Sequence, residues 1–263
     1  RYFDAIVSQS QITYDTFDTV SHLMQKLQSN TRLIWLETPS NPMMKVIDIV
    51  ELCRQVRRVS PDIVIAVDNT FLTPIFQQPL ALGADIVVHS ATKYLGGHND
   101  LLAGAVIAGN QLLAKQLTDT LITHGQVLDN FSAWLLIRSL KTLHLRMARH
   151  NENGQYLAKK LLNVAGITSV KYAGVGGMIS FYLAKGYDVN RFLTRLQLAS
   201  FAESLGGPET LITIPAIQTH HDMTIEKREA LGITDQLVRV SAGLENKLDI
   251  FEDIEQAVVG AKL

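Results

Sequence analysis

The sequence has a single cysteine, Cys53, among its 263 residues. One cysteine excludes an intrachain disulfide and a metal cluster held by several cysteines. There is no run of about 18 apolar residues, which a transmembrane helix needs, and no secretory signal pattern at the start. The formal net charge is −1, so no field across the whole chain would attract nucleic acid or a membrane surface. These absences suit a cytoplasmic protein that binds neither.

The remaining composition is that of an ordinary globular protein. Apolar residues make up 47% of the chain and charged residues 19%, and the length allows one large domain or two small ones. No repeat, charge block or low-complexity linker interrupts the sequence.

The first half of the chain alternates predicted strands with predicted helices. Short apolar runs predict strands at 33–37, 63–67, 86–88 and 103–108. Apolar spacing predicts a helix over 47–58, and residues 79–82 predict a short helix that Gly83 ends. Because the strands are too continuously apolar for a sheet with one wet face, we predict an α/β fold with a parallel sheet.

From Gln111 onward the pattern changes to long helices. One apolar helix stripe consists of Leu136, Leu140, Leu143 and Met147, and helical character continues to Leu161. After Gly166 we expect strands at 178–183 and 237–241 and a helix over the last residues. We place a domain boundary inside the long helix, so that residues 1–148 form a large domain and residues 149–263 a smaller α/β domain.

Four polar residues stand at or just after the ends of predicted strands: Glu37, Asp68, Ser90 and Lys93. Ligands of an open parallel sheet bind at the carboxyl ends of its strands. The coincidence of the four residues is therefore a stronger indication of a binding site than any one of them.

Lys93 lies in HSATKYLGGHND, residues 89–100, between small hydroxyl residues and the pair Gly96-Gly97. A surface lysine needs no such neighbours. Small residues let a flat ligand approach the backbone, and hydroxyl and N–H groups bind phosphate oxygens. A partly desolvated lysine has a lowered pKa and forms Schiff bases. The stretch therefore indicates a site for pyridoxal 5′-phosphate (PLP).

Asp68 tests this interpretation. PLP needs an acidic group against its pyridine nitrogen, and Asp68 follows the apolar run Ile63–Val67. Taken alone, Asp68 is typical of a turn or helix cap. Together with Lys93 at the end of another strand it supports a PLP site, whereas a cofactor-free Schiff-base aldolase would explain neither Asp68 nor the hydroxyl groups.

Four stretches resemble the Cys/Met metabolism family of PLP-dependent trans-sulfuration enzymes. They are ETPSNP (37–42), VDNTF (67–71), GADIVVHSATKYLGGHND (83–100) and VRVSAGLE (238–245). The similarity runs from about Thr31 to the C-terminus. It implies the aspartate aminotransferase-like fold of PLP enzymes, called fold type I, with a large parallel-sheet cofactor domain, a smaller C-terminal α/β domain and assembly into homotetramers.

The same resemblance implies roles for the residues that match. Lys93 would form the Schiff base and move protons at the substrate's α and β carbons, and Asp68 would hold the pyridinium. The hydroxyl groups of Ser90 and Thr92 would bind the phosphate. Thr70 and Asn41 would support the ring and its O3′ edge, with Glu37 nearby among the cofactor-binding residues.

The substrate residues implied by the resemblance lie in the second half. Arg239, in VRVSAGLE, would bind the substrate carboxylate, which a guanidinium binds in a forked geometry; the alternative is a surface arginine at a strand edge. Glu209 and Thr210, in SLGGPETL, would lie near the distal end of the substrate, although Pro208 departs from the family's pattern there. No metal ligands are expected.

The chain departs from the family in two places. Relatives carry a segment before Arg1 that holds a phosphate-binding loop, a tyrosine stacked on the cofactor ring and a Tyr/Arg pair for the neighbouring subunit. They also have a helical insert where residues 173–175 here join two strands directly. We expect that the sequence omits residues at both places.

Other candidate residues favour structural roles. Cys53 and Trp134 lie on apolar helix stripes and are predicted to be buried. His220-His221 are adjacent and so point apart on any regular element, which argues against a metal pair. Gly174–Gly177 lacks the full dinucleotide-binding fingerprint and is typical of a turn.

The resemblance implies γ-replacement or γ-elimination on a small amino acid, either an O-acylhomoserine or cystathionine. GHNDLLAG, AESLGG and PAIQTH favour γ chemistry, although cystathionine β-lyases share most of these residues and stay an alternative. A further alternative, of another class, is a silent fragment that needs a fuller assembly.

Overall fold

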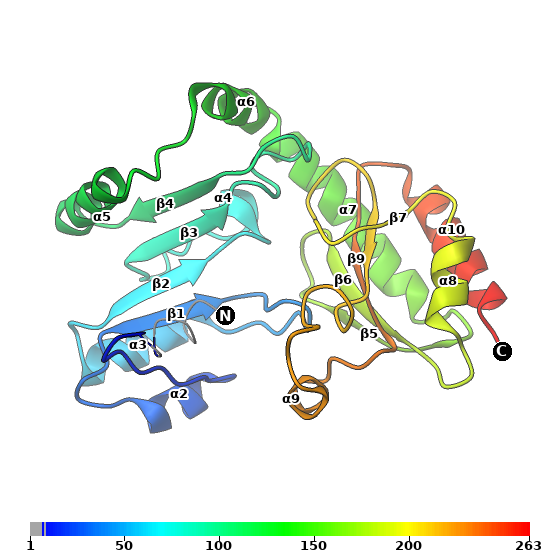
Figure 1. Cartoon of the computed structure of the whole chain (residues 1–263), viewed down its shortest axis with the longest axis horizontal. Helices are drawn as coiled ribbons and strands as arrows, with labels where there is room; N and C mark the ends of the chain where they lie inside the picture. The colour runs from blue at the N-terminus through cyan, green and yellow to red at the C-terminus, as the bar shows by residue number, and fades with distance from the viewer. Residues whose placement is uncertain (1–6, 8) are drawn as a thin grey trace.

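The computed structural model describes residue 7 and residues 9–263 and contains two sheets, each with its own helices (Figure 1). Arg1, at which the sequence analysis expected preceding residues, lies outside the described residues. The first sheet has the order β1-β2-β3-β4, formed by Leu33–Glu37, Val64–Asp68, Ile86–Ser90 and Gly104–Ala108. The second has the order β5-β6-β9-β8-β7, formed by Ile167–Tyr172, Met178–Leu183, Leu237–Ser241, Leu211–Thr213 and Ser200–Phe201. The predicted α/β class is confirmed.

The helices begin mostly where a short polar side chain accepts a hydrogen bond from the first turn. Asp48, Asn110 and Asn246 do so for α3, α5 and α10. The helices are α2 (Val20–Lys26), α3 (Ile49–Val59), α4 (Thr73–Phe76), α5 (Gln111–His124), α6 (Asn130–Leu140), α7 (Leu143–Leu161), α8 (Val189–Arg195), α9 (Ile225–Ala230) and α10 (Lys247–Gly260). None of those in the described part is long and apolar enough to cross a membrane.

The first sheet is only partly parallel. β1, β2 and β3 pair in parallel, but β4 pairs antiparallel with β3, so the prediction of a wholly parallel sheet was wrong for this strand. The chain returns from β3 to β4 through residues 91–103, which contain no helix. Parallel neighbours need a long crossover, usually helical, whereas antiparallel neighbours do not. An apolar run predicts a strand but not whether the strand pairs parallel or antiparallel. The length and structure of the connection between the two strands decide this.

Two local predictions were also wrong. Residues 79–82 form a turn closed by Ala84 N donating to Pro79 O over 3.0 Å, and a short helix occurs instead at α4. Trp134 is 56% exposed and stacks on Phe131, because α6 presents its apolar side to solvent rather than to a core. Cys53 is buried, as predicted.

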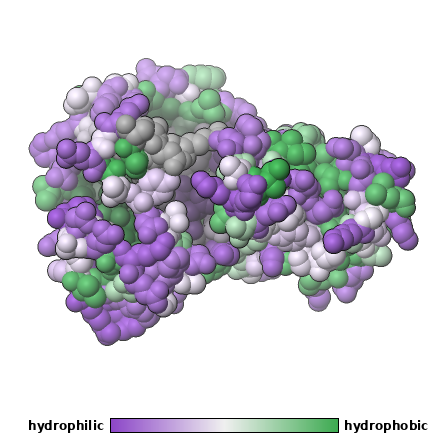
Figure 2. Space-filling view, turned by 60° about the horizontal axis from the view of Figure 1, so that its bottom comes forward, coloured by the Kyte–Doolittle hydropathy of each residue, from purple (hydrophilic) through white to green (hydrophobic). Residues whose placement is uncertain are grey.

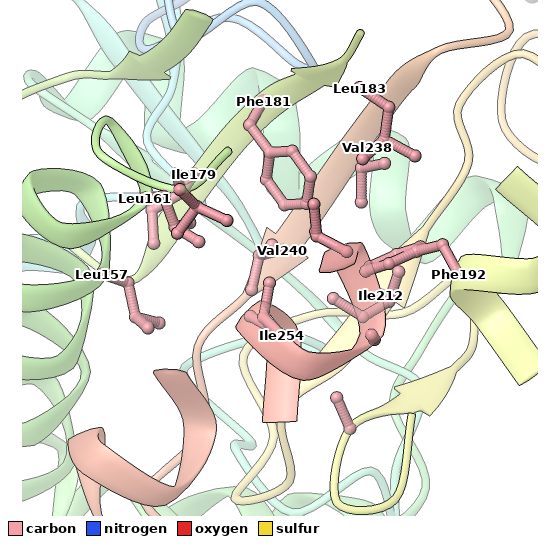
Figure 3. Close-up of a cluster of buried hydrophobic side chains, with 14 of the residues drawn as sticks. Leu157, Leu161, Ile179, Phe181, Leu183, Phe192, Ile212, Val238, Val240 and Ile254 are labelled. Atoms are coloured by element: carbon pink, nitrogen blue, oxygen red, sulfur yellow. The ribbon is translucent and has the colours of Figure 1, made fainter. Parts of the chain in front are cut away.

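Apolar burial is organised in separate clusters. On one face of the first sheet, the α3 residues Leu52 and Val56 pack against Ile65 and Val67 of β2. The second sheet packs one face against α7, α8 and α10, where Phe181 and Phe192 meet edge to face with ring centroids 6.0 Å apart (Figure 3). This burial is the main source of stability.

The long helix α7 connects the two parts. A third cluster contains Tyr94 of the first part, Met147 of α7, and Met178 and Leu205 of the second part. The predicted boundary at 148/149 falls inside α7, which is continuous, and stays a prediction. The surface shown in Figure 2 has a wider and a narrower lobe on which hydrophilic and hydrophobic residues are interspersed.

Asp253 offers a test of how the second part is held together. Its carboxylate is buried and accepts hydrogen bonds from the backbone N–H groups of Gln197, Leu198 and Ala199 over 2.8–3.0 Å. We expect Asp253→Ala to lower the free energy of unfolding by about 3 kcal/mol, because buried donors lose their acceptor. Urea unfolding measures this, with the exposed Glu252→Ala on the same helix as control; equal midpoints for both variants would contradict it.

Candidate active site

A cavity of about 140 Å³ opens at the carboxyl ends of the parallel strands. Glu37, Asp68 and Ser90 are the last residues of β1, β2 and β3, and Lys93 follows in the next turn. Its lining consists of Glu37, Pro39, Asn41, Asp68, Thr70, Phe71, Ser90, Lys93 and Leu205. The parallel register explains this grouping, because Glu37 pairs with Asp68 at the same sheet edge.

Thr70 connects the ends of β2 and β3. Its hydroxyl donates to Asp68 Oδ1 over 2.6 Å and accepts from the backbone N–H of Ser90 over 2.8 Å. The backbone N–H of Thr70 also donates to Asp68 Oδ1 over 3.0 Å. Within the described residues, neither Asp68 Oδ2 nor the Ser90 hydroxyl has a hydrogen bond. Both therefore remain available to a ligand.

Glu37 has a raised pKa although its side chain is open to solvent. Protein atoms around the carboxyl remove part of its hydration, and this desolvation, together with the charge of Asp68, raises its pKa to about 7. The backbone N–H of Asn41, which donates to Glu37 Oε1 over 2.7 Å, and the charge of Arg239 act in the opposite direction. Glu37 therefore exchanges a proton near neutral pH.

Arg239 approaches the site from the second sheet. In β9 its neighbours Val238 and Val240 join the core, so the period of two directs Arg239 to the opposite face. Its guanidinium donates to Asn41 Oδ1 over 3.1 Å, to Glu203 O over 2.6 Å and to Thr213 Oγ1 over 2.9 Å. Arg239 Nε is buried without a partner among the described residues, and burial lowers the pKa of Arg239 to about 10.

Lys93 is held between the two parts. Its Nζ donates to Ser204 Oγ over 3.3 Å, and burial followed by the charge of Arg239 lowers its pKa, against the charge of Glu203. Gly206 packs on the lysine's backbone so closely that a Cβ there would lie 3.1 Å from Lys93 C. A lysine with a lowered pKa has more of the neutral amine that attacks carbonyl carbons.

Four predicted site residues lie outside the cavity lining: Arg239, described above, and Thr92, Thr210 and Glu209. The Thr92 hydroxyl exchanges hydrogen bonds with the backbone of Ala103, accepting over 3.0 Å and donating over 3.2 Å. Thr210 is buried and donates to Glu245 Oε2 over 2.8 Å. Glu209 accepts from Asn99 Nδ2 over 2.9 Å. Their contacts are with protein groups, and their roles toward a ligand stay predictions.

Sequence reasoning missed two residues beside Lys93. Ser204 accepts the hydrogen bond from the lysine, and Glu203 influences the pKa of both Lys93 and Arg239. Both lie in AESLGG, but they follow no predicted strand. The signal was the pair Gly206-Gly207, because adjacent glycines permit close backbone approach.

The residues present fit PLP. Lys93 supplies an amine for its aldehyde, Asp68 Oδ2 a carboxylate oxygen for its pyridine nitrogen, and Ser90 a hydroxyl for its phosphate, around one cavity; among the described residues neither oxygen has a hydrogen-bond partner. No group of three or more His, Cys, Asp or Glu side chains suited to a metal ion occurs among the described residues.

The family model described as "Cys/Met metabolism PLP-dependent enzyme" matches residues 1–259. The chain belongs to this family. The match begins further upstream than the four stretches indicated. It also makes PLP the family's cofactor, in agreement with the groups around the cavity.

Curated relatives bear names from trans-sulfuration. The cystathionine γ-synthase/O-acetylhomoserine (thiol)-lyase of Bacillus subtilis is 47% identical over 95% of this chain and 66% of that protein. The cystathionine γ-synthase of Haemophilus influenzae is 45% identical over 93% of this chain and 66% of that protein. The cystathionine β-lyase of Lactococcus lactis is 41% identical over 98% of this chain and 72% of that protein. The chain thus spans about two thirds of the length of these relatives.

Solved structures confirm the fold. Cystathionine γ-lyase from Lactobacillus plantarum, complexed with L-serine, has a TM-score of 0.93 at 33% identity, over 98% of this chain and 72% of that one. Cystathionine γ-synthase from Xanthomonas oryzae, in complex with aminoacrylate and cysteine, has a TM-score of 0.92 at 36% identity. The match covers 99% of this chain and 72% of that one. The fold is therefore that of PLP-dependent cystathionine lyases and synthases.

Glu37 makes the stability of the cofactor-free protein depend on pH. Its pKa is about 7 when folded against 4.5 in the reference state, so the folded chain holds a proton that the unfolded chain releases between these values. The stabilisation is complete below the lower pKa and is lost as pH rises through the higher one. We expect the melting temperature to fall from about pH 5 to about pH 8 more in the wild type than in Glu37→Gln.

Differential scanning calorimetry at the two pH values measures this difference. Glu226→Gln, at an exposed position on α9, is the matched control and should follow the wild type. Parallel curves for the wild type and Glu37→Gln would show that Glu37 titrates alike in both states.

Proposed function

We propose that the protein is a trans-sulfuration enzyme that acts on a small amino acid by γ-replacement or γ-elimination. The observation that supports this most is one cavity lined by Lys93, Asp68 and Ser90, with Arg239 hydrogen-bonded to its wall residue Asn41. An amine, a carboxylate and a guanidinium in this arrangement suit PLP together with an amino-acid carboxylate.

Bound PLP withdraws electrons from an attached amino acid and so eases loss of its α proton. Lys93 Nζ, whose pKa is lowered, accepts that proton and returns it at a neighbouring carbon. Asp68, which Thr70 orients, would accept a hydrogen bond from the pyridine N–H through Oδ2. Arg239 orients the substrate through its carboxylate, and the Asn41 amide fixes the guanidinium.

The relatives favour γ chemistry as the proposed reaction. Those at 47% and 45% identity are named as γ-synthases, and the β-lyase of Lactococcus lactis is 41% identical. The γ reactions are replacement of the acyloxy group on the γ carbon of an O-acylhomoserine by the cysteine sulfur, with release of the carboxylate, or hydrolysis of cystathionine to cysteine, 2-oxobutanoate and ammonia.

A homotetramer, and a cytoplasmic location, are part of the same proposal. α5 has no buried side chain although it carries Leu112, Leu121 and Ile122. α6 exposes Phe131 and Ile137 beside Trp134. Exposed apolar helices of this kind are typical of surfaces that another subunit covers.

Lys93→Ala tests the cofactor site directly. We expect the wild type with added PLP to show a visible absorbance band, and Lys93→Ala to lose that band together with at least about 1000-fold of kcat. Lys185→Ala, a lysine remote from the cavity, is the control. Turnover that survives in Lys93→Ala would overturn the proposed function.

The products of cystathionine cleavage separate the two reaction types. Cysteine with 2-oxobutanoate would support γ chemistry, and homocysteine with pyruvate would assign the β-lyase reaction instead. No turnover of cystathionine, and none of O-acylhomoserine with cysteine, would favour the silent fragment.

Arg239→Lys tests carboxylate binding. A lysine keeps the charge but not the fork, so we expect KM for the amino acid to rise about 10-fold or more. Binding of PLP, followed by absorbance, should change little because Arg239 does not line the cavity. An unchanged KM would exclude Arg239 as the carboxylate ligand.

A further inference from the structure

Arg146 is a buried arginine without an acidic partner in the part of the chain that the structure describes. It lies in the second turn of α7, is 5% exposed and forms no ion pair there. A buried charge without a counter-ion is costly unless its N–H groups all find acceptors. An apolar side chain of similar length would avoid this cost, so the arginine needs another explanation.

The acceptors of Arg146 belong to two segments, the turn that carries Lys93 and the junction of α6 with α7. Nη1 donates to Tyr94 O over 2.7 Å, and Nη2 donates to Ser139 O over 2.9 Å with a longer contact of 3.5 Å to Leu95 O. Nε donates to Thr142 Oγ1 over 3.2 Å. One planar guanidinium thus ties the residue after Lys93 to the end of α6 and the start of α7.

Gly97 provides the space for this guanidinium. A Cβ at position 97 would lie 1.9 Å from Arg146 Nη1, and its φ of +65° also disfavours any side chain. Gly96 packs on the same turn, where a Cβ would lie 2.8 Å from Ala91 O. Gly97 therefore makes room for the arginine and Gly96 for the backbone of the turn, and neither glycine lines the cavity.

The turn is also held by Thr92, which exchanges hydrogen bonds with the backbone of Ala103, and by Tyr94, which is buried in the third cluster. Lys93 N donates to Ser90 O over 3.1 Å and Gly97 N donates to Lys93 O over 2.6 Å, both within the turn. Arg146 connects it to the long helix α7 through Tyr94 O. If this connection is lost, Lys93 moves relative to the groups that face it: Arg239 of β9, Glu203 of the loop between β7 and β8, and Asp68 and Glu37 of the cavity.

We propose that Arg146 is a positioning residue for Lys93, and that Gly97 is the glycine that admits it. This inference rests on the proposed function, because it assigns Arg146 to the placement of the lysine amine. The planar fork matters, since it presents separate nitrogens to Tyr94 O and Ser139 O, whereas a lysine has one nitrogen for both.

The first experiment measures the pKa of Lys93 in the cofactor-free protein. The rate at which an acetylating reagent labels Lys93 is followed against pH by peptide mass spectrometry. In Arg146→Lys we expect labelling at neutral pH to slow about 3- to 10-fold, because a displaced Lys93 regains hydration and its pKa rises. Arg149→Lys, an exposed arginine of the same helix, should match the wild type.

The second experiment uses the enzyme with PLP. We expect Arg146→Lys to lose about 10- to 100-fold in kcat with KM within about threefold. Gly97→Ala keeps the arginine but displaces it, should reproduce both effects, and decides the question if Arg146→Lys does not fold. The double variant should be no worse than the poorer single one.

Arg146 would be merely structural if folded Arg146→Lys and Gly97→Ala kept the labelling curve and kcat within about twofold of the wild type, even with a lowered unfolding midpoint. Failure of the proposed function is a separate result, shown by turnover in Lys93→Ala. The labelling experiment needs no turnover and judges Arg146 in either case.

Discussion

The parallel pairing of β1, β2 and β3 determines where the polar groups of the cavity lie. It aligns the carboxyl ends of three strands. Glu37, Asp68 and Ser90, the last residues of these strands, therefore lie at the same edge of the sheet. Thr70 then joins two of these ends by accepting from Ser90 N and donating to Asp68. The pairing also brings carboxyl groups together, which contributes to the raised pKa of Glu37.

The second sheet contributes Arg239 to the site through the alternation of side chains along β9. The alternation of β9 buries Val238 and Val240 and directs Arg239 to the other face, where Asn41 of the first part accepts from it. Burial of two cations near each other, Lys93 and Arg239, has a chemical effect, because the charge of Arg239 helps to lower the pKa of the lysine. The charge of Glu203 acts in the opposite direction and raises the pKa of Lys93.

Some of this arrangement was predictable from the sequence, for identifiable reasons. Lys93, Asp68, Ser90 and Glu37 follow apolar runs, and strand ends are a local signal. The direction of β4 was not predictable, because the loop that precedes it decides the direction. Thr92 has a hydroxyl of the kind that binds phosphate, but this hydroxyl forms hydrogen bonds with the backbone of Ala103. Ser204 reaches Lys93 across 111 residues of chain, and no local pattern encodes such a contact.

The continuity of α7 has a geometric consequence. Near its start Arg146 binds the turn of Lys93, and one and two turns later His150 and Asn153 contact Ala242 O and Gly243 O, just after the strand of Arg239. One continuous helix, α7, therefore sets the distance between the Lys93 amine and the Arg239 guanidinium. A hinge motion between the two parts would have to bend α7. The distance between the Lys93 amine and the Arg239 guanidinium therefore changes mainly through side-chain rotation and through the loops around the cavity.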